Sequence, residues 1–179
     1  HQEAGQMRCG KHALNNALGG EHFFTNEDLE AACDLVLFES MVPDDNGVLN
    51  PEEREDHIAG NGWYSEQVLA KALQATLRFR LDLMPLRANV NQHRDPSVVG
   101  AIVNQSNMHW AALKWVEERV WRLDSLHRAP ETLSHESYVR FVTPWPNSFA
   151  IVRLSATRPG VRAAAQGCDV GEIWFLEPE

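Results

Sequence analysis

Apolar residues in the first half of the chain recur with a helical period. In residues 7–18 they form one stripe made of Ala13, Leu14, Ala17 and Leu18, and two glycines end the pattern. A second helix is expected after Thr25, because Thr25 and Asp28 have the spacing of a capping box, and Cys33 falls on its core-facing side. Residues 65–74 predict a third helix, which begins with a capping serine.

From residue 77 onward the period changes to two, which is typical of strands. Strands are predicted over residues 77–83, 98–103, 109–116, 119–124 and 148–154. A tight turn at Glu117-Glu118 should join two of them into a hairpin, and a short helix is expected over residues 134–141. Because helices come first and strands later, without strict alternation, the sequence predicts an α+β class with a mostly antiparallel sheet.

Two stretches stand apart from this pattern. Residues 38–61 lose the helical period and carry an acidic cluster, so we expect a solvated, partly helical insertion or lid. Residues 155–179 follow the last strand, and within them residues 172–176 are a candidate edge strand. We therefore expect one catalytic domain over residues 1–154 and a C-terminal extension over residues 155–179.

Composition narrows the function classes. The chain has 179 residues, 44% of them hydrophobic, which is enough for one full core. Its 16 Lys and Arg against 25 Asp and Glu leave a net charge of −9, which argues against nucleic acid or an anionic membrane as the main partner. No apolar stretch is long enough to span a membrane. Three distant cysteines favour a reducing compartment, the cytoplasm or nucleus of its own cell or, for a pathogen protein, of a host.

Three residues have the order that a cysteine hydrolase needs. Cys9 lies at the start of the first predicted helix, where the helix dipole favours a thiolate. His109 begins a strand after a polar run, and Asp124 ends the next strand. In such enzymes the thiolate attacks, the imidazole transfers protons and the carboxylate orients the imidazole.

Each of these residues also has an ordinary structural interpretation. Cys9 can be a buried helix residue, His109 a surface histidine beside a core tryptophan, and Asp124 a turn residue at a strand end. Their joint occurrence in this order favours catalysis. His12 stands one helical turn after Cys9, but no second pair completes a zinc site, so we expect neither a metal nor a cofactor.

Four separated blocks resemble the Josephin family of papain-like deubiquitinases. They are Cys9-Gly10-Lys11-His12-Ala13-Leu14-Asn15-Asn16, Gly62-Trp63-Tyr64-Ser65-Glu66-Gln67-Val68-Leu69, His109-Trp110 and Trp121-Arg122-Leu123-Asp124-Ser125-Leu126. The blocks are short, but they occur in the family's order and spacing across roughly residues 1–154. The resemblance implies a papain-like fold, in which N-terminal helices that carry the nucleophile pack on the sheet.

The resemblance also implies an activity. Cys9 would be the nucleophile, His109 the general base and acid, and Asp124 the orienting residue of a triad that hydrolyses isopeptide bonds after the ubiquitin C-terminus through a thioester. The partners would be ubiquitin or polyubiquitin conjugates. The implied substrate-binding residues are Trp63, Tyr64, Gln67 and Trp110. Trp63 and Tyr64 have a second interpretation, a hydrophobic staple on the following helix.

The oxyanion glutamine is where the chain departs from the family. The family places this residue five positions before the cysteine, where this chain has Ala4. Gln2 is the favoured substitute and Gln6 the reserve, beside the backbone N–H of Cys9. Two other functions stay open: a catalytically weak ubiquitin-binding module, and a transglutaminase or deamidase that uses the same Cys-His-Asp order.

Overall fold

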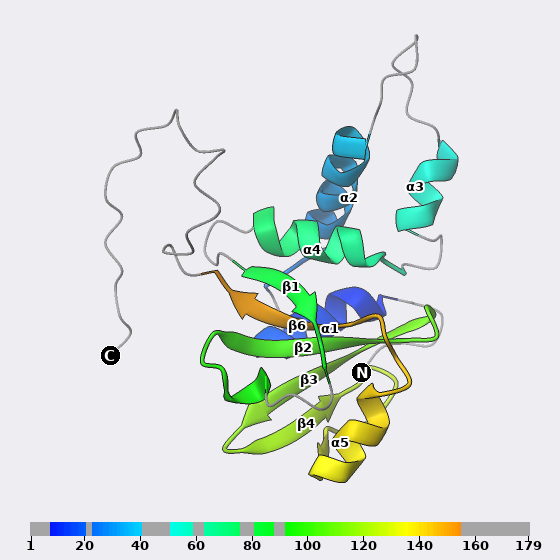
Figure 1. Cartoon of the computed structure of the whole chain (residues 1–179). Helices are drawn as coiled ribbons and strands as arrows, with labels where there is room; N and C mark the ends of the chain where they lie inside the picture. Colours follow the sequence, from blue (N-terminus) through cyan, green and yellow to red (C-terminus); the bar gives the residue numbers. More distant parts are fainter. Residues whose placement is uncertain are drawn as a thin grey trace, which may run out of the picture.

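The computed structural model describes residues 8–20, 23–40, 51–58, 63–75, 81–87 and 92–154, with the backbone alone at 51–53 and 93. The helices are α1 (Cys9–Leu18), α2 (Asn26–Ser40), α3 (Pro51–His57), α4 (Glu66–Ala75) and α5 (His135–Val142), with a 3-10 turn, η1 (Gln92–Arg94). The strands are β1 (Leu81–Pro85), β2 (Val98–Gln105), β3 (His109–Val116), β4 (Arg119–Leu123), β5 (Glu131–Leu133) and β6 (Ser148–Arg153). Figure 1 shows α1, α2 and α4 gathered beside the sheet, which confirms the expected α+β class.

The six described strands form one sheet in the order β1-β6-β2-β3-β4-β5, and every neighbouring pair is antiparallel. The last described strand, β6, therefore lies between β1 and β2. The hairpin of β3 and β4 turns at Glu117 and Glu118, whose φ angles of 50° and 63° suit the right-handed twist of the flanking strands. The predicted hairpin is confirmed.

Helix α1 packs directly on the sheet and carries the first core. A Cβ atom at Gly100 would lie 2.4 Å from the backbone oxygen of Ala17, so only glycine lets the helix approach β2 this closely. Cys33 on α2 is fully buried in this core, as expected. The core joins α1, α2, α4 and the sheet, and its largest fully buried side chains include Leu14, Leu29, Leu69, Leu73, Ile102 and Trp110.

The opposite face of the sheet has a second core, covered by α5. Tyr138 and Val142 pack there against Leu113 and Val120 from the central strands. The Tyr138 ring meets the Trp115 ring edge-on, with 6.3 Å between the ring centroids. Both faces of the central strands are therefore buried, which explains the nearly continuous apolar run in β2.

The local start signals of two helices hold in the structure. The backbone N–H of Asp28 donates to the Thr25 hydroxyl (3.2 Å) and the backbone N–H of Thr25 donates to the Asp28 carboxylate (2.7 Å), as in a capping box. The Ser65 hydroxyl accepts a longer bond from the Val68 N–H (3.4 Å) at the start of α4. Downstream of Cys9, the Asn15 side chain exchanges two bonds with the backbone of Phe24 (2.9 and 3.0 Å) and so fixes the connection from α1 to α2.

Some expectations differ from the structure or lie outside it. The strand expected over residues 77–83 is described from Leu81 and continues to Pro85, and β5 was not predicted at all. Helix α3 lies within the predicted insertion, whose residues 41–50 and 59–61 lie outside the described part. The extension over residues 155–179, including the candidate edge strand at 172–176, lies outside it too. No helix in the described ranges is long and apolar enough to cross a membrane.

Candidate active site

Cys9 is the first residue of α1 and lies almost wholly inside the protein, with 2% of its surface exposed. Arg8 precedes it at the N-cap position and makes no capping bond with its side chain. The positive end of the helix dipole therefore points at the sulfur. The next residue, Gly10, has Tyr64, Leu69 and Trp110 so close that an added Cβ would lie 3.3–3.4 Å from their side chains. This tight packing holds the helix start in place.

His109 and Asp124 come from neighbouring strands and meet at the same end of the sheet. His109 begins β3, and Asp124 directly follows β4. The His109 Nε2 lies 2.8 Å from the Asp124 Oδ1, and their side chains are only 14% and 2% exposed. Because Asp124 occupies Nε2, Nδ1 is the ring nitrogen left for the Cys9 thiol, whose interaction with the imidazole helps to raise the pKa of His109. The structure thus brings together the three residues that the sequence analysis singled out.

Charge and burial shift the pKa values of His109 and Asp124 in opposite directions. Burial alone would lower the pKa of His109, but its hydrogen bonds to Asp124 and Cys9 and their negative charges outweigh burial and raise that pKa to about 9. Burial would raise the pKa of Asp124, but bonds from His109, the Leu126 N–H and Arg122 hold it well below its usual range. At neutral pH the imidazole is therefore protonated and the carboxylate ionised.

Arg122 is a member of this site that the sequence analysis missed. One of its guanidinium nitrogens donates to the Asp124 Oδ2 at 2.7 Å, while Oδ1 accepts from His109 and from the Leu126 N–H at 3.0 Å. The guanidinium also lies 3.7 Å from the Glu131 carboxylate of β5 and 4.6 Å from the ring centre of Phe141 in α5. The available signal was the i, i+2 spacing to Asp124, which puts both side chains on one face of an extended segment.

The four expected substrate-binding residues differ in exposure. Gln67 is exposed and Trp63 is half-buried at the start of α4. Tyr64 and Trp110 are only 3% and 1% exposed, and their part in substrate binding stays a prediction. They support the start of α1 from within the core. The Trp110 indole N–H donates to the Tyr64 backbone oxygen (2.9 Å), and both side chains pack against Gly10.

Two exposed apolar residues adjoin His109 and Asp124 in the sequence. They are Met108 and Leu126, which are 70% and 64% exposed.

Both oxyanion candidates, Gln2 and Gln6, lie outside the described residues. Within the described ranges, no group of three or more His, Cys, Asp or Glu side chains is arranged to hold a metal ion.

Comparisons with known proteins find a matching family model and several relatives of the chain. The model of the Josephin family matches residues 4–145. Josephin-2 of Mus musculus and of Homo sapiens are each 31% identical to the chain over an alignment of 153 residues, and the match covers 78% of this chain and 75% of each relative. A protein named Ataxin-3 homolog from Caenorhabditis elegans is 31% identical over 140 residues, which cover 78% of this chain and 42% of that protein.

Proposed function

The chain belongs to the Josephin family, and from this premise we propose that it is a thiol-dependent ubiquitin hydrolase. The observation that carries the proposal is the buried pair of His109 and Asp124, 2.8 Å apart, with the imidazole hydrogen-bonded to Cys9 at the start of α1. A thiol, an imidazole and a carboxylate in that order form the working unit of a cysteine protease.

Attack on the substrate is the first half of the proposed reaction. The Cys9 thiolate adds to the carbonyl carbon of the terminal glycine of ubiquitin, and a C–S bond forms as the carbonyl oxygen takes the negative charge. The C–N bond to the substrate lysine then breaks, and the protonated His109 gives its proton to the leaving amine. A pKa of about 9 suits this step, because the imidazole still holds its proton at neutral pH.

Hydrolysis of the thioester is the second half. His109, now neutral, takes a proton from water, and the hydroxide adds to the thioester carbon. The C–S bond breaks, the new carboxylic acid of ubiquitin releases its proton to water and leaves as the carboxylate, and the pair of thiolate and imidazolium returns. Asp124 keeps the imidazole oriented throughout. The oxyanion would be met by the backbone N–H of Cys9 and by Gln2, with Gln6 as the reserve.

Substrate contact in this proposal falls to the exposed residues around the site. Ubiquitin or polyubiquitin conjugates are the proposed partners, with Gln67 and Trp63 on one side of Cys9. The exposed Met108 and Leu126 offer apolar contact next to the imidazole and the carboxylate. Free cysteines such as Cys9 and Cys33 are typical of a reducing compartment, so we propose the cytoplasm or nucleus as the place of action.

The proposal is tested by incubating the full chain with ubiquitin that carries a C-terminal electrophile. Intact mass and peptide mapping then identify the modified residue. We expect one adduct on Cys9 and none in the Cys9→Ala variant. Cys33 is a matched internal control, because it is a free thiol with no exposed surface, and burial raises its pKa.

The alternatives give different results in the same assay. Ubiquitin binding without an adduct on Cys9 would reject the hydrolase and identify a binding module. Absence of both binding and adduct would reject ubiquitin as the substrate, and release of ammonia from protein glutamine would then identify a deamidase or transglutaminase.

A further inference from the structure

A pocket of about 400 Å³ lies at the other end of α1 from Cys9. It is lined by Leu18, Phe23, Leu81, Pro96, Val98, Val99, Lys114, Trp115 and Arg153. Leu18 is nine positions after Cys9 in α1, so the pocket lies about 14 Å along the helix from the start of α1. Its volume is within the range of clefts that hold small ligands or aromatic side chains, about 300–1,000 Å³.

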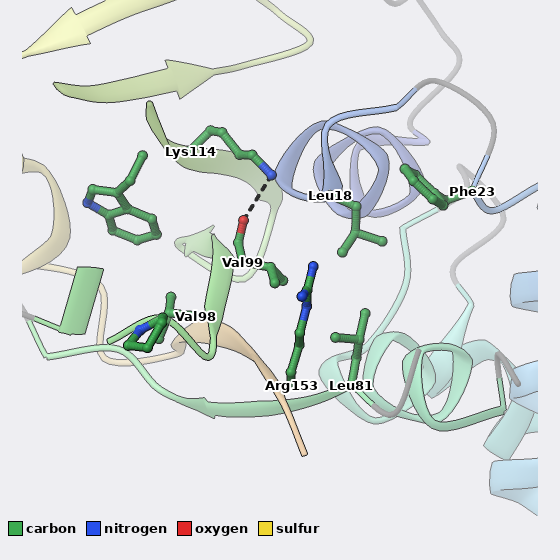
Figure 2. Close-up of a pocket in the computed structure, with 9 residues that line it drawn as sticks. Leu18, Phe23, Leu81, Val98, Val99, Lys114 and Arg153 are labelled. Atoms are coloured by element: carbon green, nitrogen blue, oxygen red, sulfur yellow. Dashed lines mark hydrogen bonds between the residues drawn. The ribbon is translucent and has the colours of Figure 1, made fainter. Parts of the chain in front are cut away.

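Among the described residues, the lining combines an apolar wall with two positive charges and no carboxylate. Figure 2 shows Leu18, Phe23 and Leu81 on one side of Arg153 and Val99 on the other, with the ammonium of Lys114 directed to Val99. Such a lining suits an apolar segment that carries negative charge.

Lys114 has donor capacity left for such a segment. Its ammonium donates to the backbone oxygens of Ala17 (2.8 Å) and Val99 (2.9 Å) and has three N–H donors in total. Burial first, and then the nearby charge of Arg153, lower the pKa of Lys114. A carboxylate placed between the two cations would relieve this repulsion and accept the remaining N–H.

The chain itself contains a segment of this chemistry. Residues 172–177 read Glu172-Ile173-Trp174-Phe175-Leu176-Glu177, an apolar and aromatic run with a carboxylate at each end. The wall residue Arg153 is followed by Leu154, the last described residue, and 17 residues, 155–171, separate Leu154 from this segment. Such a connection reaches up to about 56 Å, so the pocket is within range, and tethering gives an effective concentration of about millimolar.

We propose that residues 172–177 dock into this pocket of the same chain, with Trp174 or Phe175 against its apolar wall and a flanking carboxylate beside Lys114 and Arg153. The docked segment would cover the exposed ring of Phe23, which is 39% exposed, and would bridge the end of α1 to the start of β2.

Cys168 provides a reporter position four residues before Glu172. A nitroxide is attached to Cys168 in the full-length Cys9→Ala variant, with intact mass used to verify a single label, because Cys33 is buried. Methyl NMR signals are then compared between the oxidised and reduced label. We expect the signals of Leu18, Val98 and Val99 to lose at least about half their intensity, and that of Leu133 on β5 to keep it.

Two sets of variants make the result specific. Trp174→Ala with Phe175→Ala, and separately Arg153→Glu, should restore the pocket signals, whereas Arg119→Glu, an exposed arginine on β4, should leave the broadening unchanged. Adding Glu172→Lys and Glu177→Lys to Arg153→Glu should bring the broadening back.

Three outcomes would overturn the proposal. Equal broadening of all methyl groups, or none, would mean that the segment has no fixed place at the pocket. Broadening centred on Met84 would place it along the edge strand β1. Broadening that disappears on dilution with label-free protein would assign the pocket to a second copy of the chain.

Discussion

Asp124→Asn should disable the site in this chain because of Arg122. The two carboxylate oxygens of Asp124 both accept hydrogen bonds, Oδ1 from His109 Nε2 (2.8 Å) and the Leu126 N–H (3.0 Å), Oδ2 from Arg122 (2.7 Å). Asparagine has one acceptor oxygen. Whichever way its amide is turned, the NH₂ group faces a donor, which costs about 1–3 kcal/mol for the buried group left unpaired.

The substitution also removes the negative charge beside His109, and this electrostatic loss adds to the cost. The pKa of His109, about 9 against an ordinary 6.5, represents about 3 kcal/mol of preference for the imidazolium, which Asp124 shares with Cys9. Without the carboxylate, burial acts against the charge, and we expect the pKa of His109 to fall to about 7 or lower. The imidazole would then be largely neutral at the pH where its proton is needed for the leaving amine.

Two measurements check this prediction. NMR titration of the ring nitrogens of His109 gives the pKa directly, and cleavage of a fluorogenic ubiquitin C-terminal amide gives kcat/KM, which we expect to fall by at least about 100-fold. An unchanged pKa, within about 0.5 of the parent value, would show that the carboxylate is not its source and would refute the reasoning.

Arg122→Met supplies the decisive control. Methionine keeps an unbranched side chain at this position but cannot donate to residue 124. The double variant Arg122→Met/Asp124→Asn should be more active than Asp124→Asn alone, because the amide oxygen is then free to face His109. Losses that simply add would refute the donor conflict at residue 124.

Three further predictions concern stability. His109 has a higher pKa in the folded state than its ordinary 6.5, so its contribution to the free energy of unfolding should be complete below about pH 6.5 and disappear as the pH rises through about 9. Urea midpoints should therefore fall across this pH window in the parent protein and change less in Asp124→Asn. An equal slope in both proteins would contradict the prediction. Gly100→Ala should lower the free energy of unfolding by more than about 1–3 kcal/mol, because the added Cβ meets the backbone of Ala17. Gly20→Ala is the control, since its Cβ meets the exposed ring of Phe23, which can turn away. Equal losses of stability in thermal unfolding of the two variants would count against the close packing of α1 on β2. Thr25→Ala should cost about 1 kcal/mol through loss of the helix cap, and an unchanged urea midpoint would rule out a stabilising capping box.

Short-range patterns in the sequence were sufficient to predict many of the helices and strands. The glycine pair after Leu18, the Thr25 cap and the alternation of β3 and β4 are signals within a few residues, and the elements appear where those signals lie. Local pattern failed at β5, because three residues with two exposed side chains carry no alternation to detect. That strand exists because the backbone of Glu131–Leu133 pairs with β4.

The candidate active site likewise contains residues that the sequence identified and one that only the structure revealed. Cys9, His109 and Asp124 were singled out by residue type and order, because each alone has an ordinary structural explanation but the three in this order favour catalysis. Arg122 looked like an ordinary polar residue of a strand until Asp124 and Phe141 were seen beside it.

The sequence by itself thus determined which residues are apolar, which segments are helical or extended, and which side chains are chemically competent. Only the tertiary structure decided that β6 lies between β1 and β2, that Tyr64 and Trp110 are buried, and that one arginine holds the second oxygen of Asp124. Periodicity reports that a face is buried but not what covers it. Strand neighbours and hydrogen-bond partners are instead chosen between residues far apart in the chain, by how well whole elements pack.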